Sequence, residues 1–162
     1  MAPLHPTAAR FAESAKRLEL EVEIRQFEAT TRTAEDAARA IGCSVGQIVK
    51  SLVFFVDGEA VLTLVSGTNR LDVRKLAALC GVGGKKIKRA NADKVREVTG
   101  YAIGGVPPFA HARKLKTFID EDFWQHERVW AAGGTANTVF AIAPDDLARV
   151  TDGQAATLKC DD

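Results

Sequence analysis

The sequence predicts an α+β fold, a single domain in which a mixed β-sheet is flanked by helices. Strand-like and helix-like segments follow one another irregularly, without the regular strand–helix–strand repeat of a doubly wound fold. Asp57 and Gly58 lie between two apolar runs, a pattern typical of the turn in an antiparallel hairpin. The chain has 162 residues, 46% hydrophobic and 27% charged, which suits one globular domain and excludes collagen-like, disordered and disulfide-scaffold proteins.

The first third of the chain predicts two helices separated by a strand. Residues 7–20 have a helical apolar pattern, with Thr7 as a candidate N-cap. Residues 21–27 alternate charged and apolar side chains, which indicates a short, half-buried strand. Thr33 is positioned to cap a second helix, and Gly42 to end it.

The middle of the chain contains the most apolar strand candidate, residues 48–56. After the hairpin turn, residues 59–65 form the return strand. A helix then begins at Asp72 and ends at Gly81, and a second short helix covers residues 91–98.

The last third predicts three further strands, near residues 116–119, 128–132 and 138–142. A final helix covers residues 144–150, with a proline at its first turn. Residues 159–162 have no apolar pattern, and we expect a frayed end there.

Cysteine usage and hydropathy predict a cytoplasmic protein. Cys43, Cys80 and Cys160 are far apart, odd in number and not at metal-ligand spacing, which favours reduced thiols. No apolar stretch approaches the roughly 20 residues of a membrane span. Residues 1–10 lack the apolar region of a signal peptide.

The net charge of +1 conceals a segregated distribution. Residues 70–116 contain 12 basic and three acidic residues, a charge of +9, and the remainder therefore carries −8. One interpretation is a set of solvated helix faces; the other is a phosphate-binding surface. The candidates for phosphate contact are Arg70, Arg74, Lys85, Lys86, Lys88 and Arg89.

Lys50 interrupts the apolar strand at 48–56. Strand alternation places Lys50 on one face with Leu52, and Ser51 on the opposite face with Val53. A lysine on a buried face is costly unless it is paired or opens onto a cleft. Lys50 is therefore either a snorkelling strand-end lysine or a cation that faces an anion or a polarised carbonyl.

A loop of glycine and proline, Gly104-Gly105-Val106-Pro107-Pro108, is the second candidate. Its glycines permit close backbone approach and its prolines stiffen the chain, so it is either a ligand-binding wall or a plain structural turn. His111 follows closely; a lone histidine is more often a packing or surface residue than a catalyst, although it titrates near neutral pH.

Two further glycine-containing segments can be interpreted either as ligand-binding sites or as structural turns. Gly133-Gly134 and the segment 66–70 (Ser-Gly-Thr-Asn-Arg) are each either a turn or a backbone nest for a phosphate or ribose. The sequence has no nucleophilic triad motif, Walker loop or Rossmann fingerprint.

Over residues 33–150 the chain resembles the YbaK/EbsC family. The resemblance is carried by two motifs at this separation, the strand with Lys50 and the loop from Gly104 through His111. These proteins are free-standing relatives of the editing domain of bacterial prolyl-tRNA synthetase. The resemblance implies a curved, partly barrel-like sheet. With it, we divide the chain into an N-terminal helical arm, residues 1–20, and an editing domain, residues 21–158.

The resemblance also implies trans-editing, in which the ester between a wrong amino acid and the tRNA, most often tRNA(Pro), is hydrolysed without a metal or organic cofactor. Lys50 matches the family's principal functional residue, and the loop 104–108 matches the segment that shapes the amino-acid pocket. Gly133, Gly134, His111 and Ser51 are further substrate-binding candidates. Prolyl-tRNA synthetase is a possible partner.

This chain departs from parts of the family pattern. Some cysteine-removing members have a serine and a carboxylate around the turn that matches 131–139, and this chain has neither. Alanine-removing members often have asparagine directly after the lysine, where this chain has Ser51. Ser, Thr, Ala or a small non-protein amino acid are the expected cargo, with Cys less favoured.

Two other functions remain open from the sequence. One is a non-catalytic tRNA-binding or regulatory module, and the other is an interaction domain whose basic face binds an acidic protein. The site assignment itself requires that Lys50 and the loop 104–108 line one cleft.

Overall fold

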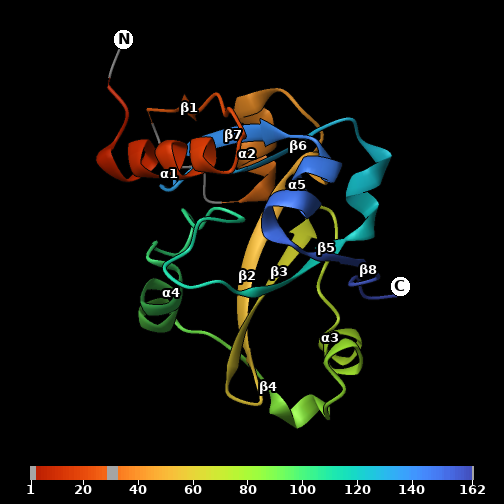
Figure 1. The fold of residues 1–162 in the computed structure, drawn as a ribbon. Helices are drawn as coiled ribbons and strands as arrows, with labels where there is room; N and C mark the ends of the chain where they lie inside the picture. The colour runs from red at the N-terminus through yellow and green to blue at the C-terminus, as the bar shows by residue number, and fades with distance from the viewer. Residues whose placement is uncertain (1–2, 29–32, 162) are drawn as a thin grey trace.

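The computed structural model describes residues 3–28 and 33–161, and its strands form two sheets (Figure 1). The larger has the order β4-β2-β3-β5-β8 and the smaller β1-β7-β6. The strands are β1 (Arg25–Gln26), β2 (Val49–Val56), β3 (Glu59–Ser66), β4 (Ile87–Arg89), β5 (Lys116–Asp120), β6 (Val129–Ala132), β7 (Thr138–Ile142) and β8 (Gln154–Ala156). The helices are α1 (Pro6–Arg17), α2 (Ala34–Ile41), α3 (Val73–Cys80), α4 (Ala92–Thr99) and α5 (Pro144–Thr151), with short 3-10 helices η1 (Val45–Gln47), η2 (Gly84–Lys86) and η3 (Glu121–Gln125).

The predicted α+β class with a mixed sheet is confirmed. Strand β2 pairs antiparallel with β3 and β4, whereas β3–β5 and β5–β8 are parallel. The two sheets meet where Ile48 bridges Trp130. Neither sheet closes on itself within the described residues, so the sheet is open rather than partly barrel-like.

Local sequence signals account for most element ends. Asp57 and Gly58 have φ of 49° and 87°, the left-handed pair of a type I′ hairpin turn. Thr33 Oγ1 accepts the Asp36 N–H at 3.0 Å and so caps α2. Helix α1 begins one residue earlier than expected, because the side chain of His5 rather than of Thr7 forms its N-cap.

Some expected elements are shorter or ordered differently. The strand expected at 21–27 is reduced to Arg25–Gln26. Strands β4 and β8 were not expected, because each has three residues and lies at a sheet edge. The end expected to be frayed is held by the turn after β3, since the Cys160 N–H bonds to the carbonyl of Arg70 at 2.8 Å; Asp162 lies outside the described residues.

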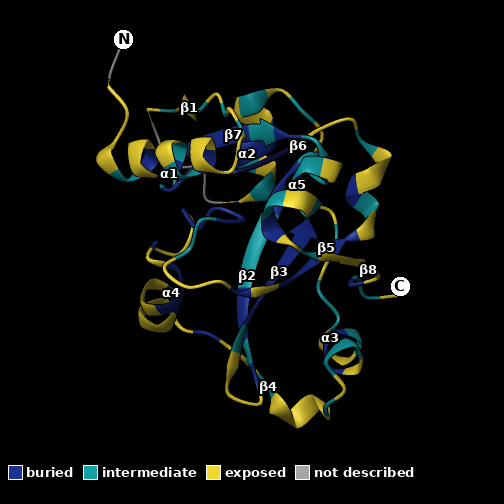
Figure 2. Ribbon diagram, in the orientation of Figure 1, coloured by how far each residue is buried: buried dark blue, intermediate teal, exposed yellow. Residues whose placement is uncertain are grey.

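The two faces of β2 pack against different parts of the core. Val49 and Val53 belong to a hydrophobic cluster formed with α4, β6 and β7. Phe54 and Val56, on the opposite face, pack in a second cluster with α3 and β5. In Figure 2 the β2–β3 hairpin is dark or teal except at its exposed turn, while the outer faces of α3 and α4 are exposed. The alternation predicted for this strand is confirmed.

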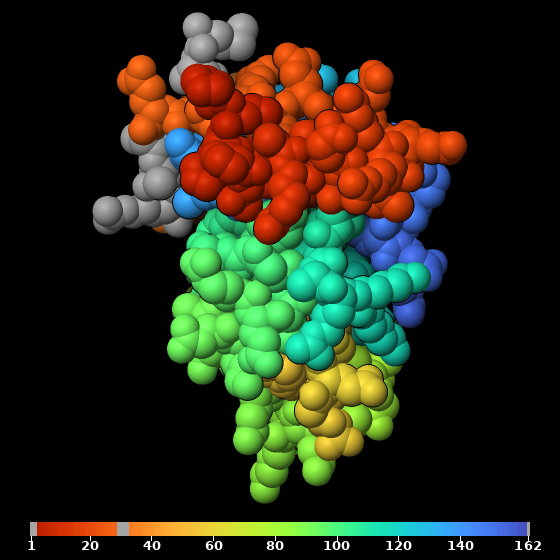
Figure 3. Space-filling view, turned by 60° about the vertical axis from the view of Figure 1, so that its left-hand side comes forward, coloured from red at the N-terminus to blue at the C-terminus, as the bar shows by residue number. Residues whose placement is uncertain are grey.

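Helix α1 packs on the segment that follows α4. The Phe11 ring lies 5.0 Å from each of the rings of Phe109 and Phe140, measured between centroids. Arg10 donates to the carbonyl of Gly100 at 3.1 Å and lies over the Tyr101 ring. Figure 3 shows this N-terminal helix, in red, resting on the green and teal surface of the later segment. Among the described residues, no helix combines the length and apolarity needed to cross a membrane.

Candidate active site

A mostly apolar cleft of about 280 Å³ lies beside β2. Lys50 and Ser51 line it from the strand, and Gly104 and Val106 line it from the glycine/proline loop. The remaining wall comes from α2, α4, β6 and β7, including Trp130. We call this space the central cleft. Lys50 and the loop therefore meet the condition that the site assignment required, since both line the same cavity.

The central cleft opens where β2 lacks a neighbouring strand. On this outer edge Ile48, the residue before β2, bridges Trp130, and β2 itself pairs with β4 only from Phe54 onward. The Ala90 N–H bonds to the Val53 carbonyl at 3.0 Å. Within the described residues no strand pairs with this edge between those points, so the peptide groups of Ser51 face the cleft.

The Lys50 side chain is half-buried and held at one point. Its Nζ donates to the main-chain carbonyl of Asn69 at 2.5 Å. The partner is neutral, so the ammonium is not neutralised by direct contact with a carboxylate. One ammonium N–H is thereby used, and two remain for other acceptors.

Several charges act on the Lys50 ammonium. Burial lowers its pKa below the ordinary lysine value. The negative charges of Glu35 and Asp120 partly offset this effect, and the cations Arg70 and Arg89 add to it. A partly desolvated ammonium interacts more strongly with a developing negative charge than an exposed one does.

Alternation places Ser51 on the strand face opposite Lys50. Both residues nevertheless line the central cleft, since the cleft extends around the open edge of β2. Among the described residues, the Ser51 Oγ is buried without a hydrogen-bond partner. A buried hydroxyl without a partner is costly, and a ligand hydroxyl or amine would satisfy it.

The glycine/proline loop contributes less surface to the central cleft than expected. Gly104, with φ of 89°, and Val106 line the cleft. Gly105, Pro107 and Pro108 are buried behind this wall. A Cβ on Gly105 would lie 2.7 Å from the Cα of Thr135, so glycine is needed for the loop to approach the turn after β6.

His111 anchors the loop rather than facing the central cleft. Its Nε2 lies 2.7 Å from the carbonyl oxygen of Pro107. Because a carbonyl only accepts, Nε2 carries the proton in this contact. Burial lowers the pKa of His111 below its ordinary value, although the bond to Pro107 acts against this.

The lowered pKa of His111 predicts a loss of stability in mild acid. The unfolded chain takes up a proton as pH falls below about 6.5, while folded His111 still resists it, so stability falls from there toward the lower folded pKa. We expect the thermal midpoint to drop less between pH 7.5 and 5.5 in His111→Gln than in the wild type. Equal drops in the two proteins would contradict this.

Gly133 and Gly134 form a turn outside the lining of the central cleft. The Gly133 N–H bonds to the Thr138 carbonyl at 3.0 Å, as in a hairpin connection. Gly134 has φ of 112°, and a Cβ there would lie 3.1 Å from the carbonyl oxygen of Thr7 in α1. These glycines permit close packing between the turn, α1 and the loop that bears Gly105.

The basic residues surround two shallow hollows beside the central cleft. The basic hollow lies along η2 and β4 and is lined by Lys85, Lys86, Lys88, Arg89 and Lys94. The arginine hollow has an apolar floor that includes Leu52, Phe54 and Ile87, and is lined also by Lys50, Arg70 and Arg89. Arg89 lines all three spaces.

One of the predicted basic residues lies away from the central cleft, and some residues that line the cleft were not predicted from the sequence. Arg74 is exposed on α3 and lines none of the three spaces. Trp130 and Thr138 line the central cleft, but each resembled an ordinary strand residue in the sequence. Asn69 was noted only as part of a turn, and its contact with Lys50 depends on tertiary structure.

A model of the family described as the aminoacyl-tRNA editing domain matches residues 28–150. The chain belongs to this family. The resemblance to YbaK/EbsC editing proteins seen in the sequence is thereby confirmed.

Relatives agree with this assignment. A crystal structure named "a putative trans-editing enzyme for prolyl tRNA synthetase" has a TM-score of 0.93 and 43% identity, covering 98% of this chain and 100% of that one. The "Putative Cys-tRNA(Pro)/Cys-tRNA(Cys) deacylase EbsC" of Enterococcus faecalis is 28% identical over 78% of this chain and 76% of its own. A proline–tRNA ligase of Maridesulfovibrio salexigens is 38% identical over 62% of this chain, which is 17% of that longer protein. The predicted enzyme class, an editing deacylase, is confirmed by the family and these names.

Proposed function

We propose that the protein is a trans-editing enzyme that hydrolyses the ester of mischarged aminoacyl-tRNA, with tRNA(Pro) carrying a small wrong amino acid as its substrate. The observation that carries this proposal is the meeting of Lys50 with Gly104 and Val106 in one small cleft. The names of the relatives support the link to prolyl-tRNA.

Hydrolysis of an aminoacyl ester requires few catalytic groups from the protein. An aminoacyl ester is already activated, so the enzyme must position it, admit water and stabilise the oxyanion. The Lys50 ammonium supplies the positive charge for the ester carbonyl oxygen. The open edge of β2 at Ser51 offers peptide groups for the α-amino group.

The acceptor end would leave the central cleft past Lys50 and Arg89, which also line the arginine hollow. The apolar floor of that hollow suits the terminal base, and Arg70 at its rim suits a phosphate. The lysines of the basic hollow continue the positive surface for further phosphates.

A panel of charged tRNAs tests the proposal. We expect the wild-type protein to release Ser, Thr, Ala or Cys from tRNA(Pro), and to leave correctly charged Pro-tRNA(Pro) largely intact. If folded protein binds tRNA but cleaves none of the esters, the protein is a non-catalytic tRNA-binding module instead. Binding to tRNA that is insensitive to salt would contradict the phosphate contacts.

The buried hydroxyl of Ser51 predicts a selective effect. In Ser51→Ala we expect kcat/KM for Ser- and Thr-tRNA(Pro) to fall about tenfold relative to Ala-tRNA(Pro), since a hydrogen bond to the cargo hydroxyl is lost. Single-turnover deacylation with the three substrates measures this. An equal loss of kcat/KM for all three substrates would show that Ser51 does not contact the side chain of the esterified amino acid.

A further inference from the structure

The Lys50 ammonium depends on a residue far from it in the sequence. Its Nζ donates to the main-chain carbonyl of Asn69, which lies in the turn that follows β3. Lysine has a long side chain with much rotamer freedom. The position of this acceptor therefore determines where the charge lies in the cleft.

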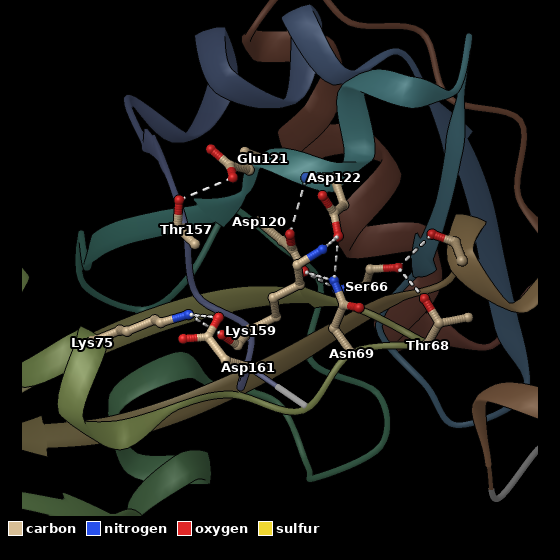
Figure 4. Close-up of polar contacts among 11 residues, drawn as sticks. Ser66, Thr68, Asn69, Lys75, Asp120, Glu121, Asp122, Thr157, Lys159 and Asp161 are labelled. Atoms are coloured by element: carbon tan, nitrogen blue, oxygen red, sulfur yellow. Dashed lines mark hydrogen bonds and ion pairs between the residues drawn. The ribbon is translucent and has the colours of Figure 1, made fainter.

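The side chain of Asn69 is itself held at two points. Its Nδ2 lies 2.8 Å from an oxygen of Asp120 and 2.8 Å from an oxygen of Asp122 (Figure 4). Both amide hydrogens are thus given to carboxylates, and such charge-assisted bonds are stronger than neutral ones. The bond from Asn69 also lowers the pKa of Asp122. The orientation of Asn69 is therefore fixed from both sides.

Asp120 ties this turn to the centre of the larger sheet. The carboxylate lies at the end of β5 and its residue is 1% exposed. It also accepts the N–H groups of Ser66 and Asp122, each at 3.0 Å. A buried carboxylate with several donors on a strand end is a rigid anchor.

The C-terminal segment contacts both Asp122 and the turn that contains Asn69. Lys159 Nζ lies 3.1 Å from Asp122, on the carboxylate oxygen that Asn69 contacts (Figure 4). The Cys160 N–H bonds to the carbonyl of Arg70, the residue next to Asn69. The turn is thus bonded to β5 on one side and to the chain's last segment on the other.

We propose that Asn69 is a positioning residue for Lys50, and that Asp120, Asp122 and Lys159 act through it to fix the ammonium at the central cleft. This inference rests on the proposed function, in which Lys50 stabilises the oxyanion. The acceptor in contact with Lys50 is the neutral carbonyl of Asn69. The carboxylates of Asp120 and Asp122 contact the Asn69 side chain instead of the ammonium. The charge is therefore oriented without being cancelled.

Kinetics of full-length variants test the proposal. We expect Asn69→Ala to lower kcat about 10- to 100-fold with little change in KM, and Lys159→Met to lower it several-fold. The matched control is Thr157→Ala, which removes a bond to exposed Glu121 on the same surface and should leave kcat unchanged.

A double-mutant cycle separates positioning from general damage. In a Lys50→Met background, Asn69→Ala should have little further effect, because its action passes through the lost ammonium. The proposal is overturned if Asn69→Ala keeps the wild-type kcat, or if it lowers kcat equally in both backgrounds.

A measurement without substrate makes failure of this proposal distinct from failure of the proposed function. We expect the Lys50 ammonium to give a slowly exchanging ¹H–¹⁵N signal in the wild type and in Thr157→Ala, and to lose it in Asn69→Ala. An unchanged signal in Asn69→Ala overturns the proposal, whether or not the wild type hydrolyses any tRNA. If Asn69→Ala does not fold, Lys159→Met should show faster ammonium exchange than the wild type, and unchanged exchange counts against it.

Discussion

Lys50→Met is expected to lower the deacylation rate about 10²–10³-fold, the usual effect of removing one oxyanion-stabilising donor. The substitution keeps most of the side-chain volume and removes the ammonium that donates to Asn69. Because the proposed phosphate contacts fall on Arg70 and on the lysines of the basic hollow rather than on Lys50, tRNA affinity should change little. Single-turnover rates and filter binding on the same tRNA measure the two quantities.

Lys85→Met is the matched control for that substitution. Lys85 is exposed in the basic hollow and lines neither the central cleft nor the arginine hollow. We expect weaker tRNA binding, a salt slope reduced by about one, and an unchanged rate at saturation. A loss of tRNA affinity in Lys50→Met together with a loss of deacylation rate in Lys85→Met would contradict the assignment of catalysis to the central cleft and of tRNA binding to the basic hollow.

Gly105→Ala is expected to damage both stability and activity. The new Cβ would lie 2.7 Å from the Cα of Thr135 and 2.8 Å from the carbonyl oxygen of Gly134, and backbone atoms cannot rotate away. We expect a loss of about 1–3 kcal/mol in the free energy of unfolding. The displaced loop should lower kcat/KM about 10²-fold, since an error near 1 Å has that effect.

Gly84→Ala provides the comparison for Gly105→Ala. Gly84 is exposed in η2, and a Cβ there would meet no atom within 4 Å. Its denaturant midpoint and deacylation rate should match the wild type. A Gly105→Ala protein with wild-type stability and rate would show that the loop accommodates the methyl group and does not shape the cleft.

Much of the fold was predictable because its signals are local. Caps and left-handed glycines depend on a few neighbouring residues, so Thr33, Gly42 and the Asp57-Gly58 turn could be assigned without tertiary information. The alternation of β2 likewise follows from the strand's own residues. The edge strands β4 and β8 were missed because three residues are too few for a period.

The candidate site was predictable only in outline. Lys50 and the glycine/proline loop stand out as local anomalies, and the resemblance joins them. The buried position of Pro107 and Pro108 behind the wall depends on contacts between α1, the loop and β7, which no local pattern encodes.

By itself the sequence determined the α+β class, the ends of α2, α3 and α4, the hairpin, the face of β2 that bears Lys50 and the segregation of positive charge. Tertiary structure decided that Ser51 reaches the central cleft at an open strand edge. It also decided that Lys50 meets the carbonyl of Asn69, whose side chain bonds to Asp120 and Asp122. The reason is physical: a residue's pattern is set by its near neighbours, whereas a site is set by which distant segments the packed core brings together.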